Sequence, residues 1–132
     1  MKKLLDHFSV AIVDDDESLC RSLGRLLRAA GLNPVTYPSA EAFLDDAQHP
    51  PFDCLLLDVQ LGGISGVELQ RRLVASGERT PVVFLTAYDD PEWRAQAIAA
   101  GCAAYFRKND SGADVLEAIR RSAIRNPELE SS

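Results

Sequence analysis

The feature that most constrains the fold is a strict alternation of short apolar runs with longer segments of helical periodicity. The apolar runs occupy residues 8–13, 34–37, 53–58, 81–86 and 103–108. After each run, apolar residues recur every three or four positions, in the segments 17–31, 39–47, 65–77, 90–101 and 111–124. Short apolar runs are typical of buried strands, and the longer segments are typical of amphipathic helices. The sequence therefore predicts five strand–helix pairs.

The expected helices carry recognisable end signals. Ser39 stands at the start of one helix as an N-cap, and Ser65 with Glu68 forms the pattern of a capping box. Asp90 followed by Pro91 is typical of a helix start. Strict strand–helix alternation favours a parallel sheet with helices on both faces. We therefore predict a single α/β domain.

Length and composition agree with one globular domain. The chain has 132 residues, of which 46% are hydrophobic, and we expect the domain to span 1–124, with 125–132 as a polar tail or the start of a linker. No apolar window reaches the ~18 residues of a membrane span, and the N-terminus lacks a signal-peptide pattern. The net charge of −6 argues against direct binding of nucleic acid by this chain. A cytoplasmic protein without a membrane partner is expected.

The three cysteines, Cys20, Cys54 and Cys102, are far apart and lie among apolar residues. No histidine is spaced to serve them as a catalytic partner or as a fellow metal ligand. We interpret them as small buried hydrophobic residues in a reducing compartment.

Polar residues stand where the apolar runs end. The first run ends in Asp14, Asp15 and Asp16, and Asp58 ends the third. Thr86 ends the fourth run and Lys108 ends the fifth. Ligands of open parallel sheets bind outside the carboxyl ends of the strands, so these side chains are expected to converge.

Single residues of this set have simpler explanations. Asp16 fits an N-cap of the following helix, whereas Asp14 and Asp15 are not both needed for capping. Asp58 lies too far before Ser65 to cap the third helix. The second strand, 34–37, offers only Tyr37 and is expected at an edge of the sheet, away from the site.

Clustered carboxylates without a neighbouring histidine or cysteine predict a site for a hard divalent cation, and Mg²⁺ is the expected cofactor. A carboxylate beside Mg²⁺ can attack a phosphoryl group, because the metal screens the approach of two anions. Lys108 can neutralise the same oxygens, and Thr86 can donate a hydrogen bond to the product. The chemistry expected is phosphoryl transfer onto an aspartate, which gives an acyl phosphate.

Four motifs carry a resemblance to a known family: "IVDDD", "LLLDVQLGGISG", "VVFLTA" and "AAYFRK". In this order and spacing, over about residues 8–124, they resemble the receiver domain of two-component response regulators, within the CheY-like superfamily. The resemblance implies a flavodoxin-like three-layer fold with five helices and strand order 2-1-3-4-5. It also implies a signalling phosphoprotein of a phosphorelay, not a conventional enzyme, that assists its own phosphorylation and dephosphorylation.

The resemblance also implies roles for individual residues. Asp58 corresponds to the phosphoacceptor and, with Asp15 and the carbonyl of Gln60, to the direct Mg²⁺ ligands. Asp14 would reach the metal through water. Lys108 corresponds to the lysine that pairs with the phosphate. The phosphodonor would be the phosphohistidine of a sensor histidine kinase or of a phosphotransfer protein.

By the same resemblance, Thr86 corresponds to the switch hydroxyl, Ala87 to the small neighbour that admits phosphate, and Tyr105 to the switch aromatic. The helix 90–101 is rich in alanine and is expected to shift easily. The face made by helix 90–101, strand 103–108 and helix 111–124 is therefore the expected output surface, or the surface of a phosphorylation-dependent homodimer.

Two positions depart from the family pattern. Leu61 and Gly62 stand where the family often has Met-Pro, and glycine frees a loop that proline would restrain. Asn109 stands where the family usually has a proline, often in cis, after the lysine. We expect a trans peptide there, because a non-proline cis bond costs ~3 kcal/mol.

Two other functions remain open at this stage. A phosphatase of the haloacid-dehalogenase type would use Asp14 as its nucleophile within the pair Asp14 and Asp16, but it leaves Asp58 without a role. A receiver that acts only as a constitutive binding module would not need its intact acidic set. The acceptor residue separates the first alternative from ours, and Mg²⁺ titration separates the second.

Overall fold

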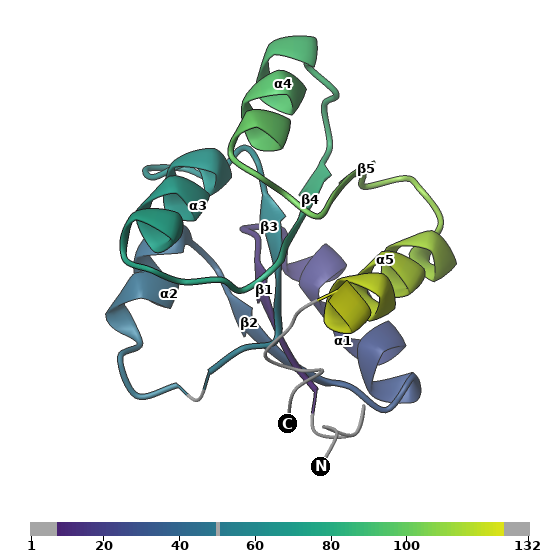
Figure 1. Cartoon of the computed structure of the whole chain (residues 1–132). Helices are drawn as coiled ribbons and strands as arrows, with labels where there is room; N and C mark the ends of the chain where they lie inside the picture. Colours follow the sequence, from purple (N-terminus) through teal and green to yellow (C-terminus); the bar gives the residue numbers. More distant parts are fainter. Residues whose placement is uncertain (1–7, 50, 126–132) are drawn as a thin grey trace.

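The computed structural model describes residues 8–49 and 51–125, of which residues 123–125 are placed as helix backbone only. Strands and helices alternate along the chain (Figure 1): β1 (Ser9–Val13), α1 (Glu17–Ala29), β2 (Asn33–Tyr37), α2 (Ala40–Asp45), β3 (Cys54–Asp58), α3 (Gly66–Ala75), β4 (Val82–Thr86), α4 (Pro91–Ala99), β5 (Ala104–Arg107) and α5 (Gly112–Arg125). The five predicted strand–helix pairs are confirmed.

The strands form one parallel sheet in the order β2-β1-β3-β4-β5. Every residue of β3 and β4 is buried, whereas β2 and β5 are partly exposed. Apolar side chains throughout β3 and β4 are needed because both faces of these strands are covered. The predicted flavodoxin-like fold is confirmed, as is the edge position of the strand at 34–37.

Two apolar layers separate the sheet from its helices. Leu55 and Leu57 point to the layer that α2, α3 and α4 cover, and Leu56 points to the layer under α1 and α5. This alternation follows from the period of two in a strand. Figure 1 shows the same division, with α2, α3 and α4 on one side of the sheet and α1 and α5 on the other. The layers fix the strands and leave their carboxyl ends free for polar side chains.

The expected helix caps are present. The side chain of Ser39 accepts a hydrogen bond from Ala42 N at 3.0 Å, and that of Ser65 accepts one from Glu68 N at 3.1 Å. Asp90 caps α4 in the same way, with α4 beginning at Pro91. The reciprocal half of the capping box differs from expectation, because the Glu68 carboxylate pairs with Arg72 at 3.2 Å. Observed bounds otherwise lie within one or two residues of the predicted ones.

The last helix ends one residue later than expected. Helix α5 continues to Arg125, and the expected tail lies almost wholly in residues 126–132, which are outside the described residues. Within the described part of the chain, no helix combines the length and hydropathy that crossing a bilayer requires.

The cysteines follow the expectation in two of three positions. Cys20 and Cys54 are buried, and burial raises the pKa of Cys20 to about 11 and that of Cys54 to about 12. Both thiols therefore stay protonated near neutral pH and are poor nucleophiles. The expectation of burial is wrong for Cys102, which is half-buried because it lies in the exposed turn before β5.

Candidate functional site

The carboxyl ends of four strands bring the expected side chains together at one edge of the sheet. Asp14 follows β1, whereas Asp58 and Thr86 are the last residues of β3 and β4. Lys108 follows β5, and its backbone N–H donates to Thr86 O at 2.8 Å, which ties the lysine to the end of β4. Asp14 N donates to Tyr37 O at 3.1 Å, so the end of β1 is tied to β2 in the same way.

The ammonium group of Lys108 joins two of the acids. Its Nζ lies 2.9 Å from Asp58 Oδ2 and 2.9 Å from Asp14 Oδ2. The side chain of Lys108 is 16% exposed, and those of Asp14 and Asp58 are 3% and 5% exposed. The peptide between Lys108 and Asn109 is trans, as expected. Proline is therefore not required at position 109 for this lysine to reach the acids.

Burial and the ion pair shift the pKa values of Asp14 and Lys108 in opposite directions. Burial raises the pKa of Asp14, although a hydrogen bond from the Asp16 backbone and the proximity of Lys108 partly offset the effect. Burial alone would lower the pKa of Lys108, but its hydrogen bonds and charge interactions with Asp58 and Asp14 outweigh burial and raise that pKa. Lys108 is thus cationic at neutral pH and compensates the buried carboxylates.

Three carboxylates of this edge can reach a common point. One oxygen each from Asp14, Asp15 and Asp58 lies within 4.8 Å of the others. Asp15 is exposed, while the other two are buried. All the donors are carboxylate oxygens, the ligand type that hard cations such as Mg²⁺ prefer. The residues present therefore fit a divalent cation of this class.

Backbone hydrogen bonds orient the two buried carboxylates. Asp16 N donates to Asp14 Oδ1 at 2.9 Å, and Gln60 N donates to Asp58 Oδ1 at 3.0 Å. Each acid thus uses one oxygen for the turn that follows its own strand. The side chain of Asp16 accepts from Leu19 N at 3.1 Å, which confirms the expectation that Asp16 is the N-cap of α1.

Thr86 and Tyr105 lie on the neighbouring strands β4 and β5. The Thr86 hydroxyl donates to Tyr88 O at 2.9 Å, so it is directed to its own loop. Tyr105 is half-buried, and the guanidinium carbon of Arg94 lies 5.5 Å from the centre of its ring. The buried Tyr105 hydroxyl has no hydrogen-bond partner among the described residues. Ala87 follows Thr86 and is exposed.

Two contacts at the site were not expected from the sequence. A Cβ at Gly66 would collide with Asp58 O, so only glycine lets α3 begin this close to β3. Glu41, in the first turn of α2, accepts a hydrogen bond from Ile64 N at 3.1 Å in the loop that follows Asp58. Glycine and an acidic first turn are common in many helices, so neither residue signalled its role in the linear sequence.

Comparison with known proteins gives a consistent result. The family model described as the response regulator receiver domain matches residues 10–120. The chain is 36% identical over 119 residues to the response regulator protein TmoT of Ectopseudomonas mendocina, an alignment that covers 90% of this chain and 54% of TmoT. It is 34% identical to the transcriptional regulatory protein FixJ of Azorhizobium caulinodans, over 93% of this chain and 58% of FixJ.

A solved structure agrees with these sequence relatives. The response regulator receiver protein from Burkholderia phymatum superposes with a TM-score of 0.76 at 41% identity, over 87% of this chain and 94% of that protein. The chain spans only about half the length of curated relatives such as TmoT and FixJ.

Proposed function

The chain belongs to the response regulator receiver domain family, and on that premise we propose that it receives a phosphoryl group on Asp58 from a phosphohistidine. The donor is a sensor histidine kinase or a phosphotransfer protein. One observation carries the assignment: Asp58 ends β3, the middle strand of the sheet, with Lys108 Nζ at 2.9 Å and the other two carboxylates of the cluster within 4.8 Å. Asp14 makes the same contact with Lys108 but follows β1, away from the middle strand. An acceptor beside a cation and a metal-binding set is what phosphoryl transfer to a carboxylate requires.

The carboxylate cluster would hold Mg²⁺. Asp15 and Asp58 are the proposed direct ligands together with the backbone carbonyl of Gln60, and Asp14 would bind through water. When bound, Mg²⁺ supplies positive charge that lets two anionic groups approach each other. The carboxylates of this chain would hold the cation beside Asp58.

The transfer itself needs few protein groups. A carboxylate oxygen of Asp58 forms a bond to phosphorus while the N–P bond of the phosphohistidine breaks, and its electron pair stays on the imidazole nitrogen. Lys108 neutralises the phosphoryl oxygens from the side of β5, and the small side chain of Ala87 leaves room for them. Attack by water on the acyl phosphate later restores the carboxylate. The domain thus assists its own phosphorylation and dephosphorylation without acting as a conventional enzyme.

Phosphorylation changes the hydrogen bonds that Thr86 can make. Its hydroxyl now donates to Tyr88 O, and new phosphoryl oxygens on Asp58 offer an alternative acceptor. We infer that Thr86 turns inward to this acceptor and vacates space that the ring of Tyr105 then fills. A modest difference in free energy between the two arrangements is enough to change their populations.

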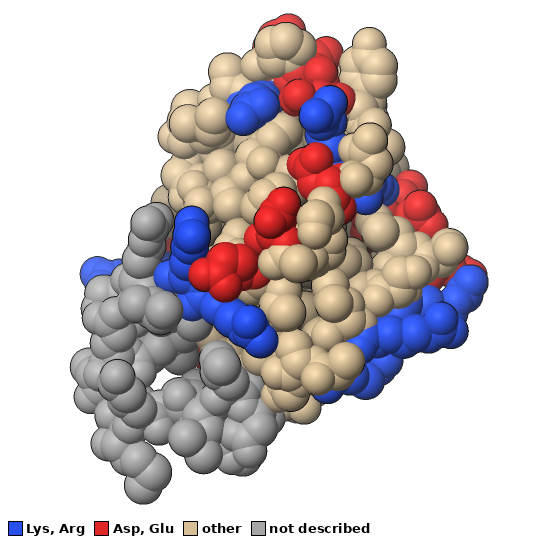
Figure 2. All heavy atoms as spheres, turned by 90° about the vertical axis from the view of Figure 1, so that its right-hand side faces the viewer, with Lys and Arg blue, Asp and Glu red and all other residues tan. Residues whose placement is uncertain are grey.

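The output surface is proposed to be the face of α4, β5 and α5. Within α4, all of which is described, Ala97 alone is buried, so the helix is weakly anchored. Figure 2 shows the side of the molecule that α5 helps to form, where acidic side chains make a diagonal band with Lys and Arg on both sides of it. A charged surface of mixed sign favours a selective protein partner.

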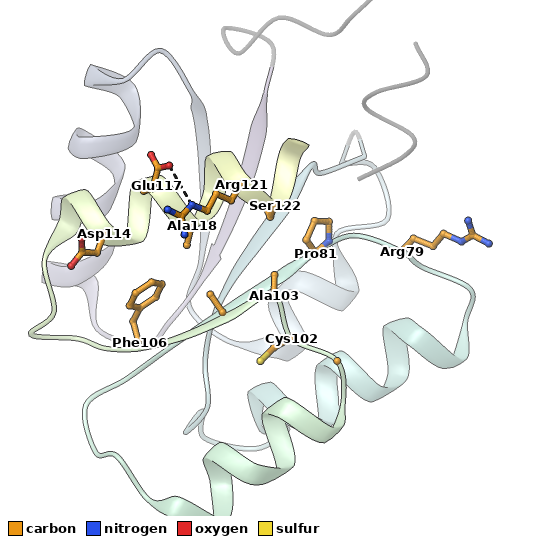
Figure 3. Close-up of a pocket in the computed structure, with 12 residues that line it drawn as sticks. Arg79, Pro81, Cys102, Ala103, Phe106, Asp114, Glu117, Ala118, Arg121 and Ser122 are labelled. Carbon is orange, nitrogen blue, oxygen red and sulfur yellow. Dashed lines mark ion pairs between the residues drawn. The ribbon is translucent and has the colours of Figure 1, made fainter. Parts of the chain in front are cut away.

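A cavity of about 650 Å³ lies between β5 and α5 on this face. Its lining includes Ala103, Phe106 and Ala118, with the ion pair of Glu117 and Arg121 (3.4 Å) at its edge (Figure 3). Small side chains on both elements leave space that an apolar side chain of a partner can fill. We propose a phosphorylation-dependent homodimer as the main use of this face.

The cellular location and the output of the regulator are also proposed from the comparisons. FixJ is named a transcriptional regulatory protein, and this chain matches 58% of its length. We propose a cytoplasmic regulator whose transcriptional output lies in a different segment, so that the receiver itself does not bind nucleic acid. A net charge of −6 supports that division.

Mass spectrometry after incubation with acetyl phosphate tests the acceptor. Phosphate is expected on Asp58 only when Mg²⁺ is present, and Asp58→Asn should remain unmodified. Phosphate on Asp14 would favour a phosphatase of the haloacid-dehalogenase type instead. A protein that binds neither Mg²⁺ nor phosphate would be a constitutive binding module.

A further inference from the structure

The loop that follows Asp58, residues 59–65, is anchored well in its first half and poorly in its second half. It contains Gly62 and Gly63, of which Gly63 has a φ of 79°. Val59 and Leu61 anchor the first half of the loop by burial, with 3% and 8% of their surfaces exposed, and Gly66 N donates to Val59 O at 3.1 Å. The second half has no buried side chain before α3, because Ile64 and Ser65 are only partly buried. A loop with paired glycines samples many conformations unless a specific contact restrains it.

A carboxylate from α2 supplies such a contact to the second half of the loop. Glu41 Oε2 accepts a hydrogen bond from Ile64 N at 3.1 Å, across 23 positions of sequence. The carboxylate also fits against Gly63 so closely that a Cβ there would collide with Glu41 Oε2. The other oxygen, Oε1, is buried and has no hydrogen-bond partner among the described residues. The Glu41 carboxylate therefore contacts the loop and is not directed toward solvent.

Glu41 is itself held firmly by its helix. The preceding residue, Ala40, is fully buried, and Phe43 is 5% exposed. Ser39 caps the helix with a hydrogen bond from Ala42 N at 3.0 Å. These contacts fix the first turn of α2 against the sheet, so the carboxylate reaches the loop from a stable base.

We propose that Glu41 is a positioning residue for the phosphorylation site, which holds the loop 59–65 in the conformation that binds the metal. The inference rests on the proposed function, because Gln60 in this loop offers its backbone carbonyl as a metal ligand. Gln60 N also donates to Asp58 Oδ1 at 3.0 Å, so displacement of the loop disturbs the acceptor as well. Glu41 is not part of the carboxylate cluster of Asp14, Asp15 and Asp58.

The expected effect on Mg²⁺ affinity depends on the fraction of molecules whose loop has the metal-binding conformation. If only a fraction of the molecules holds the loop correctly, the apparent Mg²⁺ dissociation constant rises by the inverse of that fraction. Loss of a hydrogen bond to a charged acceptor is expected to raise it by about tenfold in Glu41→Ala. Glu41→Gln keeps an acceptor oxygen for Ile64 N and should stay within about threefold of the parent.

Calorimetric titration of the whole chain with Mg²⁺ is the experiment, and thermal unfolding of each variant checks that the fold persists. Glu92→Ala is the matched control, because Glu92 is an exposed first-turn glutamate of α4 whose removal leaves the loop 59–65 untouched. Equal loss of affinity in Glu41→Ala and Glu41→Gln would show an effect of charge and overturn the positioning role. Parent affinity in Glu41→Ala would also overturn it.

The two glycines provide a second, independent comparison. Gly63→Ala places a methyl group against Glu41, whereas Gly62→Ala meets open space. We expect weakened Mg²⁺ binding in the first variant, from this contact and from the strain of alanine at a φ of 79°, and little change in the second. The backbone strain is the same with and without Glu41, so only a double-variant comparison isolates the contact. The double variant Glu41→Ala, Gly63→Ala should lose less affinity than the sum of the single changes, because the two sites are in contact. Additive losses would contradict the contact.

The titration separates this inference from the proposed function. A parent protein that binds no Mg²⁺ refutes the proposed function and the positioning role together. A parent that binds Mg²⁺ and is phosphorylated on Asp58, with a Glu41→Ala variant indistinguishable from it, refutes the positioning role alone.

Discussion

The acidic edge of the sheet is packed more tightly than the α4–β5 region. Every residue of β3, which ends in Asp58, is buried, and α1 buries four residues against the sheet. By contrast, β5 has no fully buried residue and α4 buries only Ala97. Catalytic geometry depends on fixed positions, whereas a switch needs two arrangements of similar free energy. The difference is in packing, and it supports the proposal that the acidic edge carries the chemistry and the α4–β5 region carries the response.

The largest expected effect is on the free energy of unfolding. Leu57→Ala removes a side chain with no exposed surface from β3 and should lower stability by about 3 kcal/mol. Ile98→Ala, at a residue of α4 that is 59% exposed, should change it by less than about 0.5 kcal/mol. Urea denaturation of both variants measures the contrast. Similar losses would mean that α4 is anchored as firmly as the central strand.

The second prediction compares a buried ionic contact with an exposed one. Lys108→Met leaves Asp14 and Asp58 without their cation and should destabilise the metal-free protein by about 2 kcal/mol at pH 7. Arg121→Met removes an exposed ion pair with Glu117 and should cost at most about 0.5 kcal/mol. Urea denaturation in the presence of a chelator measures both values.

The pH dependence of the Lys108 contribution has a definite sign. Because the folded pKa of Lys108 is raised, its contribution is fully present below the unfolded pKa of about 10.5. The contribution is lost as pH rises through the folded pKa. The stability difference between the parent and Lys108→Met should therefore shrink at strongly alkaline pH. A difference that grows there would contradict the assigned contact.

The third prediction distinguishes the proposed roles of Asp14 and Asp15 at the acidic edge. Asp15→Ala should weaken Mg²⁺ binding by about tenfold, because the variant lacks a proposed direct ligand. Asp14→Ala should weaken it less, because water can replace a ligand that itself acted through water. Equal affinities in a Mg²⁺ titration of the two variants would refute this division.

Much of the acidic edge could be predicted from the sequence. The positions of Asp14, Asp58, Thr86 and Lys108 follow from where apolar runs end, because parallel strands deliver their carboxyl ends to one edge. Helix ends were also predictable within a residue or two, since local side chains such as Ser39 determine them.

Contacts between distant segments could not be predicted in this way. Glu41 reaches Ile64 only after α2 has packed on the sheet, and nothing in its local sequence specifies that partner. The present direction of the Thr86 hydroxyl, toward Tyr88 O, likewise depends on the fold of the loop after β4. Cys102 shows the same limit, because local apolar neighbours indicated burial that the exposed turn before β5 does not provide.

The smallest expected effect concerns the response itself. Beryllofluoride, a phosphoryl mimic, should bind at Asp58 and offer the Thr86 hydroxyl an acceptor in place of Tyr88 O. Because α4 is held by little buried surface, a bias of about 1 kcal/mol is enough to shift it. Amide exchange in residues 86–108 should then change by about two- to tenfold, while β3 and α3 change little. Asp58→Asn with the same reagent is the control. If amide exchange in residues 86–108 is unaltered while fluorine NMR shows the adduct bound, the α4–β5 region is not the switch.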